Sequence, residues 1–211
     1  MGHRIAALCL WTLLFFTAVA QAKDFKMNTA AEGGYLWLFA YDRHASHIDI
    51  DPAPAFGGTL FQLFDFNWAR NMVGEINYIY CAARGEAFSW DDEKEKVTDG
   101  DDSTLFDIAM HHAAFNPGYV FEGRRLHPYI SGGLGATYLI FQPIEGKKKD
   151  EVDFTINLGA GADYTIWETG QAALERLDLG LRVRYYYIFQ KDIVDAAMNG
   201  VSVTLRLNLR W

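Results

Sequence analysis

The segment H-A-S-H-I-D-I-D, residues His44–Asp51, holds the residue types that bind metals or activate nucleophiles. A divalent cation takes imidazole and carboxylate ligands, and the His44-x-Ser46 spacing would suit a hydroxyl nucleophile beside its base. Both chemistries need side chains that converge, and a polar connection does not fix their positions. We therefore interpret the segment as a solvated loop. The weaker alternative to a solvated loop is a metal site, for which the candidate ligands are His44, His47, Asp49 and Asp51.

A second segment, residues Trp90–Ser103, is strongly acidic and reads W-D-D-E-K-E-K-V-T-D-G-D-D-S. Its D-G-D-D stretch offers carboxylates for calcium, but the spaced ligands and the distal glutamate of an EF-hand loop are missing. Charge runs of this kind are usually solvated, so we expect another polar loop and no bound cofactor.

A third set of charged residues lies inside segments where polar and apolar residues alternate. Carboxylates and guanidiniums at the polar positions would pair if those positions were enclosed, because an isolated buried charge is very costly. The result would be a plug of paired charges or, alternatively, the lining of a narrow pore. The predicted interior ion-pair network comprises Asp65, Glu75, Asp153, Asp163, Asp178, Arg182, Arg184, Arg206 and Arg210.

The alternation that positions these charges is clearest near the C-terminus. Along V-S-V-T-L-R-L-N-L-R-W, residues Val201–Trp211, odd-numbered residues are apolar and even-numbered residues are polar. This period of two is typical of a β-strand with two different faces. Similar segments lie at about 32–42, 75–80, 105–121, 127–141, 152–166 and 178–187, and another ends near residue 68. Eight such strands predict an all-β, antiparallel, up-and-down barrel.

The segment at residues 105–121 is the least regular of the eight. Its apolar residues occupy even positions in the first half and odd positions in the second half. A β-bulge near His111 and His112 would return both halves to one face, so we predict a bulge there. The two histidines are expected to be structural, with one facing inward and one outward, or with the bulge between them.

The first 22 residues predict a cleaved secretory signal peptide. Arg4 supplies a positive charge, residues 5–16 are apolar, and A-V-A-Q-A ends in the small residue Ala22. The mature domain would span residues 23–211 and keep Cys81 as its single cysteine, so no internal disulfide is expected. No later apolar run approaches the ~18 residues of a membrane helix, so a mature chain in a membrane would cross it as strands.

Charge and composition distinguish a lipid-facing barrel from a soluble one. The net charge of −8 offers no basic surface for nucleic acid. All eight lysines fall in the N-terminal tail or in predicted connections, whereas a water-facing sheet normally carries lysine on its strands. Tyr, Trp and Phe are frequent at the strand ends, and short connections alternate with longer or more polar ones, as in outer-membrane barrels. We therefore expect the apolar face to contact lipid.

Several motifs resemble one known family. F-N-P-G-Y-V-F precedes H-P-Y-I-S-G-G-L-G-A, and N-L-G-A-G-A-D-Y and an aromatic-ended last strand follow. With the signal sequence and the eight segments, they resemble the OmpA/OmpX-type outer-membrane β-barrel family over essentially the whole mature chain, most specifically at Pro128–Gly135. The resemblance implies a location in the cell outer membrane and Trp211 as the signal read by the barrel-assembly machinery. It also implies that the protein is a monomer surrounded by lipids and lipopolysaccharide. The segment Lys147–Glu151 could contact the anionic groups of the lipopolysaccharide.

Two classes of function fit such a barrel. We favour a non-enzymatic protein that serves envelope integrity or surface interaction. The alternative is a lipid A-modifying enzyme, an acyltransferase or deacylase, which needs a His, a Ser and usually an acid near the outer leaflet. The candidates His44, Ser46, Asp102 and Ser103 lie in predicted loops, and their neighbours do not resemble the motifs of either enzyme family. We predict no catalytic residue, and a low-conductance pore is a further alternative.

Overall fold

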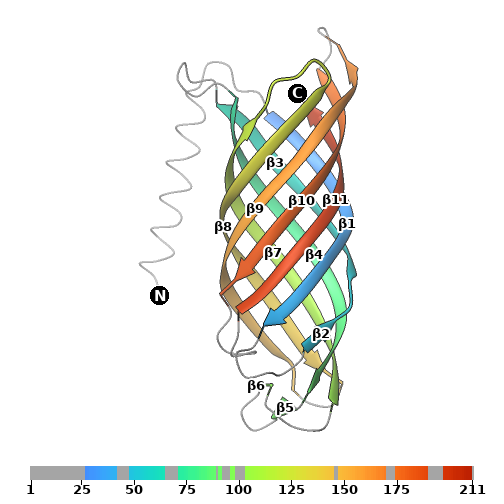
Figure 1. Ribbon diagram of the computed structural model, residues 1–211, viewed down its shortest axis with the longest axis vertical. Helices are drawn as coiled ribbons and strands as arrows, with labels where there is room; N and C mark the ends of the chain where they lie inside the picture. Colours follow the sequence, from blue (N-terminus) through green and yellow to red (C-terminus); the bar gives the residue numbers. More distant parts are fainter. Residues whose placement is uncertain are drawn as a thin grey trace.

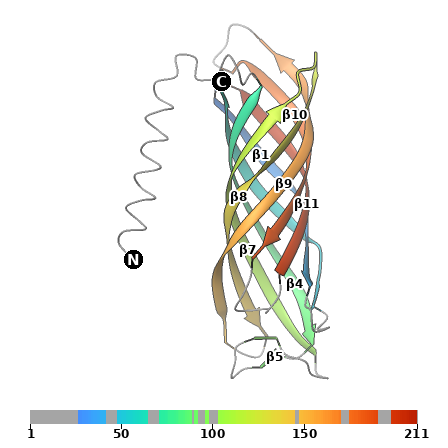
Figure 2. The ribbon, with the colours of Figure 1, turned by 60° about the vertical axis from the view of Figure 1, so that its left-hand side comes forward.

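A closed antiparallel barrel forms the protein (Figure 1, Figure 2). The computed structural model describes residues 27–41, 48–64, 71–88, 90–91, 96–97, 103–144, 147–169, 174–189 and 197–210. Within these ranges, eight long strands build the wall: β1 (Met27–Tyr41), β3 (Ala53–Phe64), β4 (Met72–Phe88), β7 (Ser103–Val120), β8 (Leu126–Pro143), β9 (Lys149–Glu168), β10 (Arg176–Ile188) and β11 (Ala197–Arg210). The predicted all-β, eight-stranded, up-and-down fold is confirmed.

Every long strand pairs with its sequence neighbours, and the first and last strands close the wall. The β1–β11 ladder runs from Asn28 opposite Arg210 to Tyr41 opposite Ala197. Closure leaves no long edge unpaired, which matters in lipid because an unsatisfied amide costs several kcal/mol there. The short strand β2 (Ile48–Ile50) pairs with β4, and β5 (Trp90–Asp91) pairs with β6 (Lys96–Val97) in a separate hairpin. The described residues include no helix of a length and hydropathy that would span a membrane.

The two ends of the barrel differ. The C-terminal end of β11 lies at one rim, and β2 and the β5–β6 hairpin lie at the other (Figure 1). We call these the inner rim and the outer rim. The outer rim carries the two longest connections, between β1 and β3 and between β4 and β7. Two lysines predicted to lie outside strands belong to strands there: Lys149 begins β9 and Lys96 lies in β6. Both positions are at the outer rim, where a strand ends and water is available.

The wall has a buried polar face and an exposed apolar face. On β11, Thr204, Arg206 and Asn208 are buried, whereas Leu205 and Leu207 are exposed. Aromatic side chains lie at two levels of the apolar outer surface. Tyr78, Tyr80 and Tyr138 surround His111 about midway along the barrel, and Tyr119 packs edge-on against Phe121 near the inner rim. Such paired girdles are typical of a barrel surrounded by a bilayer.

The bulge predicted in β7 is wrong. The strand keeps one register with β4, from Met72 opposite Tyr119 to Phe88 opposite Ser103. His112 is fully buried and His111 lies on the outer face, so the inward-outward alternative is confirmed. A register shift occurs instead between β9 and β10, next to Asp178. The apolar residues of β7 change parity because the barrel interior changes from polar to apolar along its axis.

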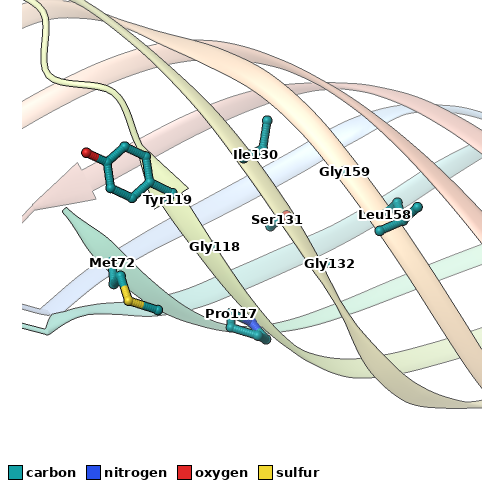
Figure 3. Close-up of a pocket in the computed structure, with 9 residues that line it drawn as sticks. All are labelled: Met72, Pro117, Gly118, Tyr119, Ile130, Ser131, Gly132, Leu158 and Gly159. Carbon is teal, nitrogen blue, oxygen red and sulfur yellow. The ribbon is translucent and has the colours of Figure 1, made fainter. Parts of the chain in front are cut away.

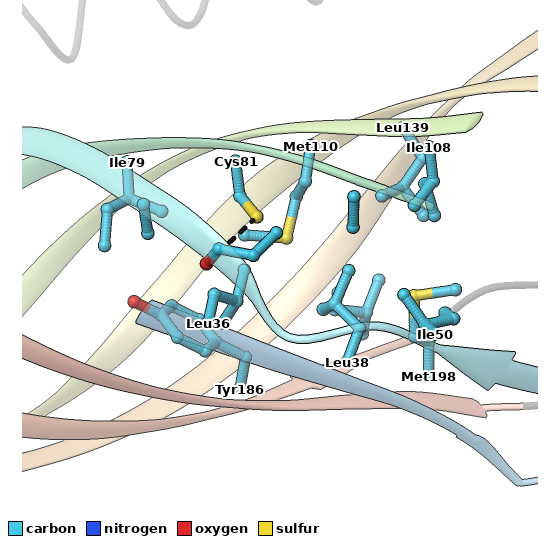
Figure 4. Close-up of a cluster of buried hydrophobic side chains, with 14 of the residues drawn as sticks. Leu36, Leu38, Ile50, Ile79, Cys81, Ile108, Met110, Leu139, Tyr186 and Met198 are labelled. Carbon is cyan, nitrogen blue, oxygen red and sulfur yellow. Dashed lines mark hydrogen bonds between the residues drawn. The ribbon is translucent and has the colours of Figure 1, made fainter. Parts of the chain in front are cut away.

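Apolar side chains fill the outer half of the interior (Figure 4). Phe106 and Phe141 stack there with their ring centroids 4.3 Å apart, and each is at most 3% exposed. We call this cluster the apolar layer. It comprises Leu36, Leu38, Ile50, Ala53, Ala55, Ile79, Cys81, Ala83, Phe106, Ile108, Met110, Leu139, Phe141, Tyr186, Ile188 and Met198. Toward the inner rim, the same inward positions carry charged and polar residues.

Candidate functional site

The inner half of the barrel holds a layer of paired charges centred on Glu75. This residue of β4 is 2% exposed. Arg182 of β10 binds it with both terminal nitrogens, Nη1 donating to Oε1 at 2.8 Å and Nη2 to Oε2 at 2.6 Å. Arg184, two positions along β10 and therefore on the same inward face, also donates to Glu75 Oε1. Two guanidiniums thus share one carboxylate, in the forked geometry that favours Arg over Lys.

A second carboxylate, Glu32 of β1, binds two of the guanidiniums. Its Oε1 accepts from Arg182 Nη1 at 3.0 Å and lies 3.4 Å from Arg206 Nε. The hydroxyls of Thr59 and Thr204 also donate to Glu32. Glu32 was absent from the predicted network. The parity of its strand was the available signal, because the even positions of β1 face inward.

Tyr129 of β8 is the other central residue that the sequence analysis did not identify. Its hydroxyl accepts from Arg182 Nε at 3.0 Å and from Arg206 Nη1. The same ring lies 5.4 Å and 5.0 Å from these two guanidinium carbons. Tyr129 therefore holds both cations through its oxygen and through the face of its ring. An aromatic residue on the inward parity of β8 was the signal for this role.

Three further predicted residues, Asp163, Asp178 and Arg210, lie nearer the inner rim. Asp163 Oδ2 is 3.5 Å from Arg206 Nη1, and Asp178 accepts from Arg176 Nε at 2.7 Å. The amide of Asn208 lies 3.5 Å from both carboxylates and connects them. Arg210 is separate, with its Nε 3.8 Å from Glu175.

The other candidates lie elsewhere. Asp153 is buried farther toward the outer rim on β9. Asp49 and Asp51 are exposed, and Ser103 begins β7. Among the residues that the structure describes, no group of three or more His, Cys, Asp or Glu side chains could hold a metal ion. Candidates outside the described residues are Asp65, His44, Ser46, His47, Asp102 and Trp211.

A belt of neutral polar groups separates the charged layer from the apolar layer. His112 Nδ1 lies 2.9 Å from the Thr137 hydroxyl, which lies 2.6 Å from the Thr155 hydroxyl. Tyr186 packs edge-on against His112 and reaches Ser202 at 3.2 Å. The Thr137 hydroxyl is the partner of the imidazole, and among the described residues no carboxylate is hydrogen-bonded to it as in a catalytic triad. The belt can hold strands together, but its geometry is not that of a nucleophile and base.

An eight-stranded closed wall with a charged interior and an apolar outer face defines a transmembrane β-barrel. The chain matches the family model of the outer membrane protein beta-barrel domain over residues 7–209, and it belongs to that family. None of the curated proteins matches the sequence. The family and the fold place the protein in the cell outer membrane, in an environment of lipid and lipopolysaccharide.

Solved structures show the same architecture at low sequence identity. OprG of Pseudomonas aeruginosa is 11% identical, with a TM-score of 0.51 over 89% of this chain and 95% of its own. The N-terminal barrel domain of Pseudomonas aeruginosa OprF is 14% identical, with a TM-score of 0.49 over 88% and 97%. Neisserial surface protein A is 13% identical, with a TM-score of 0.47 over 88% and 96%. At these identities the likeness concerns the fold alone. Outer-membrane barrels place short turns in the periplasm and longer loops outside, so the inner rim is periplasmic.

Proposed function

We propose that this protein is a closed, non-enzymatic barrel that supports the envelope and presents its outer loops for surface interaction. The observation that supports this proposal is that two successive layers of side chains fill the interior of the barrel. A charged layer occupies the inner half and an apolar layer occupies the outer half. Eight strands leave an interior that side chains can just fill, so two successive layers leave no continuous aqueous path.

The charged layer bridges strands from different sides of the wall. Arg182 on β10 is bound to Glu32 on β1 and Glu75 on β4, and it also contacts Tyr129 on β8. These contacts fix the long side chains that would have to move aside in a gated pore. Hydrocarbon lines most of the apolar layer, although the Asp153 carboxylate is also buried in this half, and an ion that entered the layer would lose much of its hydration. Both features favour a closed barrel rather than a narrow pore.

The outer face also supports a non-enzymatic role. His111 lies on the outer face about midway along β7 and is the candidate base for a lipid A-modifying site. Its Nδ1 is 2.8 Å from the Tyr78 hydroxyl, and its ring packs against Tyr80 and Tyr138. These neighbours are aromatic. The Tyr138 hydroxyl donates to Asp150 at 2.9 Å, so a carboxylate lies one residue beyond His111, but a hydrolase or acyltransferase would also need a serine there.

Two measurements test the proposal. In planar bilayers we expect no conductance steps from the purified barrel, and steps that Arg182→Ala enlarges would favour the pore. Lipid A from cells with and without the protein should have the same mass spectrum. A mass change that Ser46→Ala abolishes, while Ser202→Ala preserves it, would favour the enzyme instead.

We further propose that the protein acts as a monomer beside lipopolysaccharide. Lys147 and Lys148 are exposed at the β8–β9 connection on the outer rim, where anionic lipid groups lie. Recognition of Trp211 by the barrel-assembly machinery stays a prediction from the sequence resemblance.

A further inference from the structure

Two glycine-rich motifs lie side by side in the inner wall of the barrel. S-G-G-L-G begins at Ser131 on β8, and N-L-G-A-G begins at Asn157 on β9. Ser131 is opposite Gly159 in the β8–β9 ladder (Figure 3), and Gly133 is opposite Asn157. The odd-numbered residues of both motifs face the interior. This stretch of the wall therefore has few side chains of its own between the charged layer and the apolar layer.

Three inward glycines of the motifs are covered by side chains from a neighbouring strand. A Cβ at Gly133 would lie 2.5 Å from Asn116 Oδ1, one at Gly135 would lie 2.9 Å from His112 Cε1, and one at Gly161 would lie 2.5 Å from the Tyr129 hydroxyl. Each of these positions already has a neighbour packed over it.

Gly159 differs, because two polar groups meet over it without covering it. A Cβ at Gly159 would lie 3.1 Å from Ser131 Oγ and 3.3 Å from Arg184 Nε. Ser131 reaches this point from β8 and Arg184 from β10, the two strands that flank β9. Among the described residues, neither Ser131 Oγ nor Arg184 Nε has a hydrogen-bond partner, and both side chains are buried. A molecule bound over Gly159 would therefore contact both groups.

Two asparagines add three more unpaired atoms beside this point. Asn157 is completely buried, and neither its Nδ2 nor its Oδ1 has a hydrogen-bond partner within the described parts of the chain. Asn157 lies two positions from Gly159 and therefore on the same face of β9. Asn116 Oδ1, which lies over Gly133 next to Asn157, is also unpaired. Buried polar groups are normally hydrogen-bonded, so five such atoms in one place indicate a bound molecule.

The chemistry of these atoms identifies the molecule. Arg184 Nε and Asn157 Nδ2 can only donate a hydrogen bond, whereas the two asparagine oxygens can only accept one. An inorganic anion would leave the acceptors unpaired, and a metal cation would lie beside a guanidinium. Water both donates and accepts. A buried water makes about three hydrogen bonds, so about two molecules would satisfy all five atoms.

We propose that about two water molecules are bound over Gly159 as a permanent part of the barrel. One accepts from Arg184 Nε and bonds Ser131 Oγ, and the other bonds Asn157 and Asn116. The pair joins β7, β8, β9 and β10 at the level where the glycine motifs provide no side chains to do so. Because the charged layer and the apolar layer close the interior on either side, these molecules exchange with bulk water only when the barrel opens locally.

NMR of the folded barrel in detergent micelles tests for the bound water. NOE and ROE spectra are recorded between water and two groups, the side-chain amide of Asn157 and the Nε–H of Arg184. We expect cross peaks of opposite sign in the two spectra, which identify long-lived water. Absence of cross peaks at both groups would overturn the proposal. Cross peaks of equal sign, which fast-exchanging water gives, would also overturn it and would indicate an open lumen, which the bilayer recordings detect independently.

Gly159→Ala places a methyl group at the position of the bound water. It should abolish the cross peak at Arg184 and lower the urea midpoint of unfolding, because Ser131 and Arg184 lose their shared partner. Gly58→Ala is the matched control, since its Cβ would meet only a backbone oxygen, that of Ala30 at 3.3 Å. The control should keep the cross peaks and the midpoint of the parent. A Gly159→Ala barrel at least as stable as the control would contradict the proposal.

Asn157→Leu tests the second set of contacts. With water bound, leucine leaves the hydrogen bonds of the water unmade and should lower the midpoint. In a dry interior the unpaired amide would itself be a cost, so leucine would raise the midpoint and the proposal would be wrong. The double variant with Ser131→Ala should lose less than the sum of the two single losses, because one water pair connects both residues. Strict additivity would show that the two residues share no ligand.

Discussion

Replacing Glu75 with alanine is the most direct test of the barrel interior. Glu75 is the carboxylate shared by Arg182 and Arg184, and all three side chains are almost completely buried. After Glu75→Ala, Arg182 retains Glu32 as a partner. Arg184 loses the carboxylate that it binds and stays in a part of the barrel that has little room for water.

The expected loss of stability follows from this geometry. Removing one partner of a buried ion pair typically costs about 3–5 kcal/mol, because the remaining charge is left uncompensated. We expect the free energy of unfolding of Glu75→Ala to fall by that amount. With a urea dependence of about 1–3 kcal/mol per molar, the unfolding midpoint would fall by about 1 M or more.

The assay is urea unfolding of the purified barrel in detergent or liposomes, followed by tryptophan fluorescence. Glu86→Ala is the matched control, because Glu86 lies on the same strand and is exposed. Leu207→Ala is a second control that loses only apolar contact on the lipid-facing side. Both controls should cost less than Glu75→Ala. A Glu75→Ala barrel as stable as the parent would refute the reasoning and favour a wetter, open interior.

Further predictions concern Tyr129, the apolar layer, the inward glycines and the outer surface. Tyr129→Phe keeps the ring beside both guanidiniums but removes the hydroxyl that binds them, so the same titration should show a loss of about 1–3 kcal/mol. Phe106→Ala should lower the free energy of unfolding by about 3–5 kcal/mol, while bilayer current stays at baseline because the charged layer still closes the interior. Gly34→Ala should reduce the folded fraction seen by electrophoresis of unheated samples, since its Cβ would lie 2.0 Å from the Val203 carbonyl oxygen; Gly33→Ala should fold like the parent. Arg84→Ala breaks an exposed pair with Asp107 and should leave the unfolding midpoint unchanged.

Alternation predicts the fold where the two faces of a strand differ in polarity. Along β9, and along β11 from Val201 onward, the inward residues are polar or glycine and most outward ones are apolar, so the strand type and the facing of Arg206 follow from parity alone. The same rule fails in β7. Phe106 and Met110 enter the apolar layer, while Leu105 is exposed on the opposite face. When both faces of a strand are apolar, residue parity does not show which face points inward. The change of the barrel interior from apolar to polar along β7 therefore resembled a bulge in the sequence.

The candidate site was predictable only in part, for a different reason. Parity places Glu75, Arg182 and Arg184 inward, but the partner of each depends on the stagger of strands that are distant in sequence. Glu32 on β1 binds Arg182 on β10, and β11 lies between these two strands. The contact therefore depends on both the β1–β11 register and the β10–β11 register. Tyr129 was overlooked because an inward aromatic residue does not follow the polar pattern of its face.

The apolar layer also has a consequence for biogenesis. Its strands carry apolar residues on both faces in their outer halves, as in Y-Y-Y-I-F at Tyr185–Phe189 and Y-L-I-F at Tyr138–Phe141. Uncharged, β-prone windows without proline are those that aggregate when a chain is unfolded. Before insertion these windows have neither lipid nor a partner layer to cover them. We therefore expect delivery to the membrane to need either a holding chaperone or insertion faster than self-association, so that kinetics would limit the yield of folded protein.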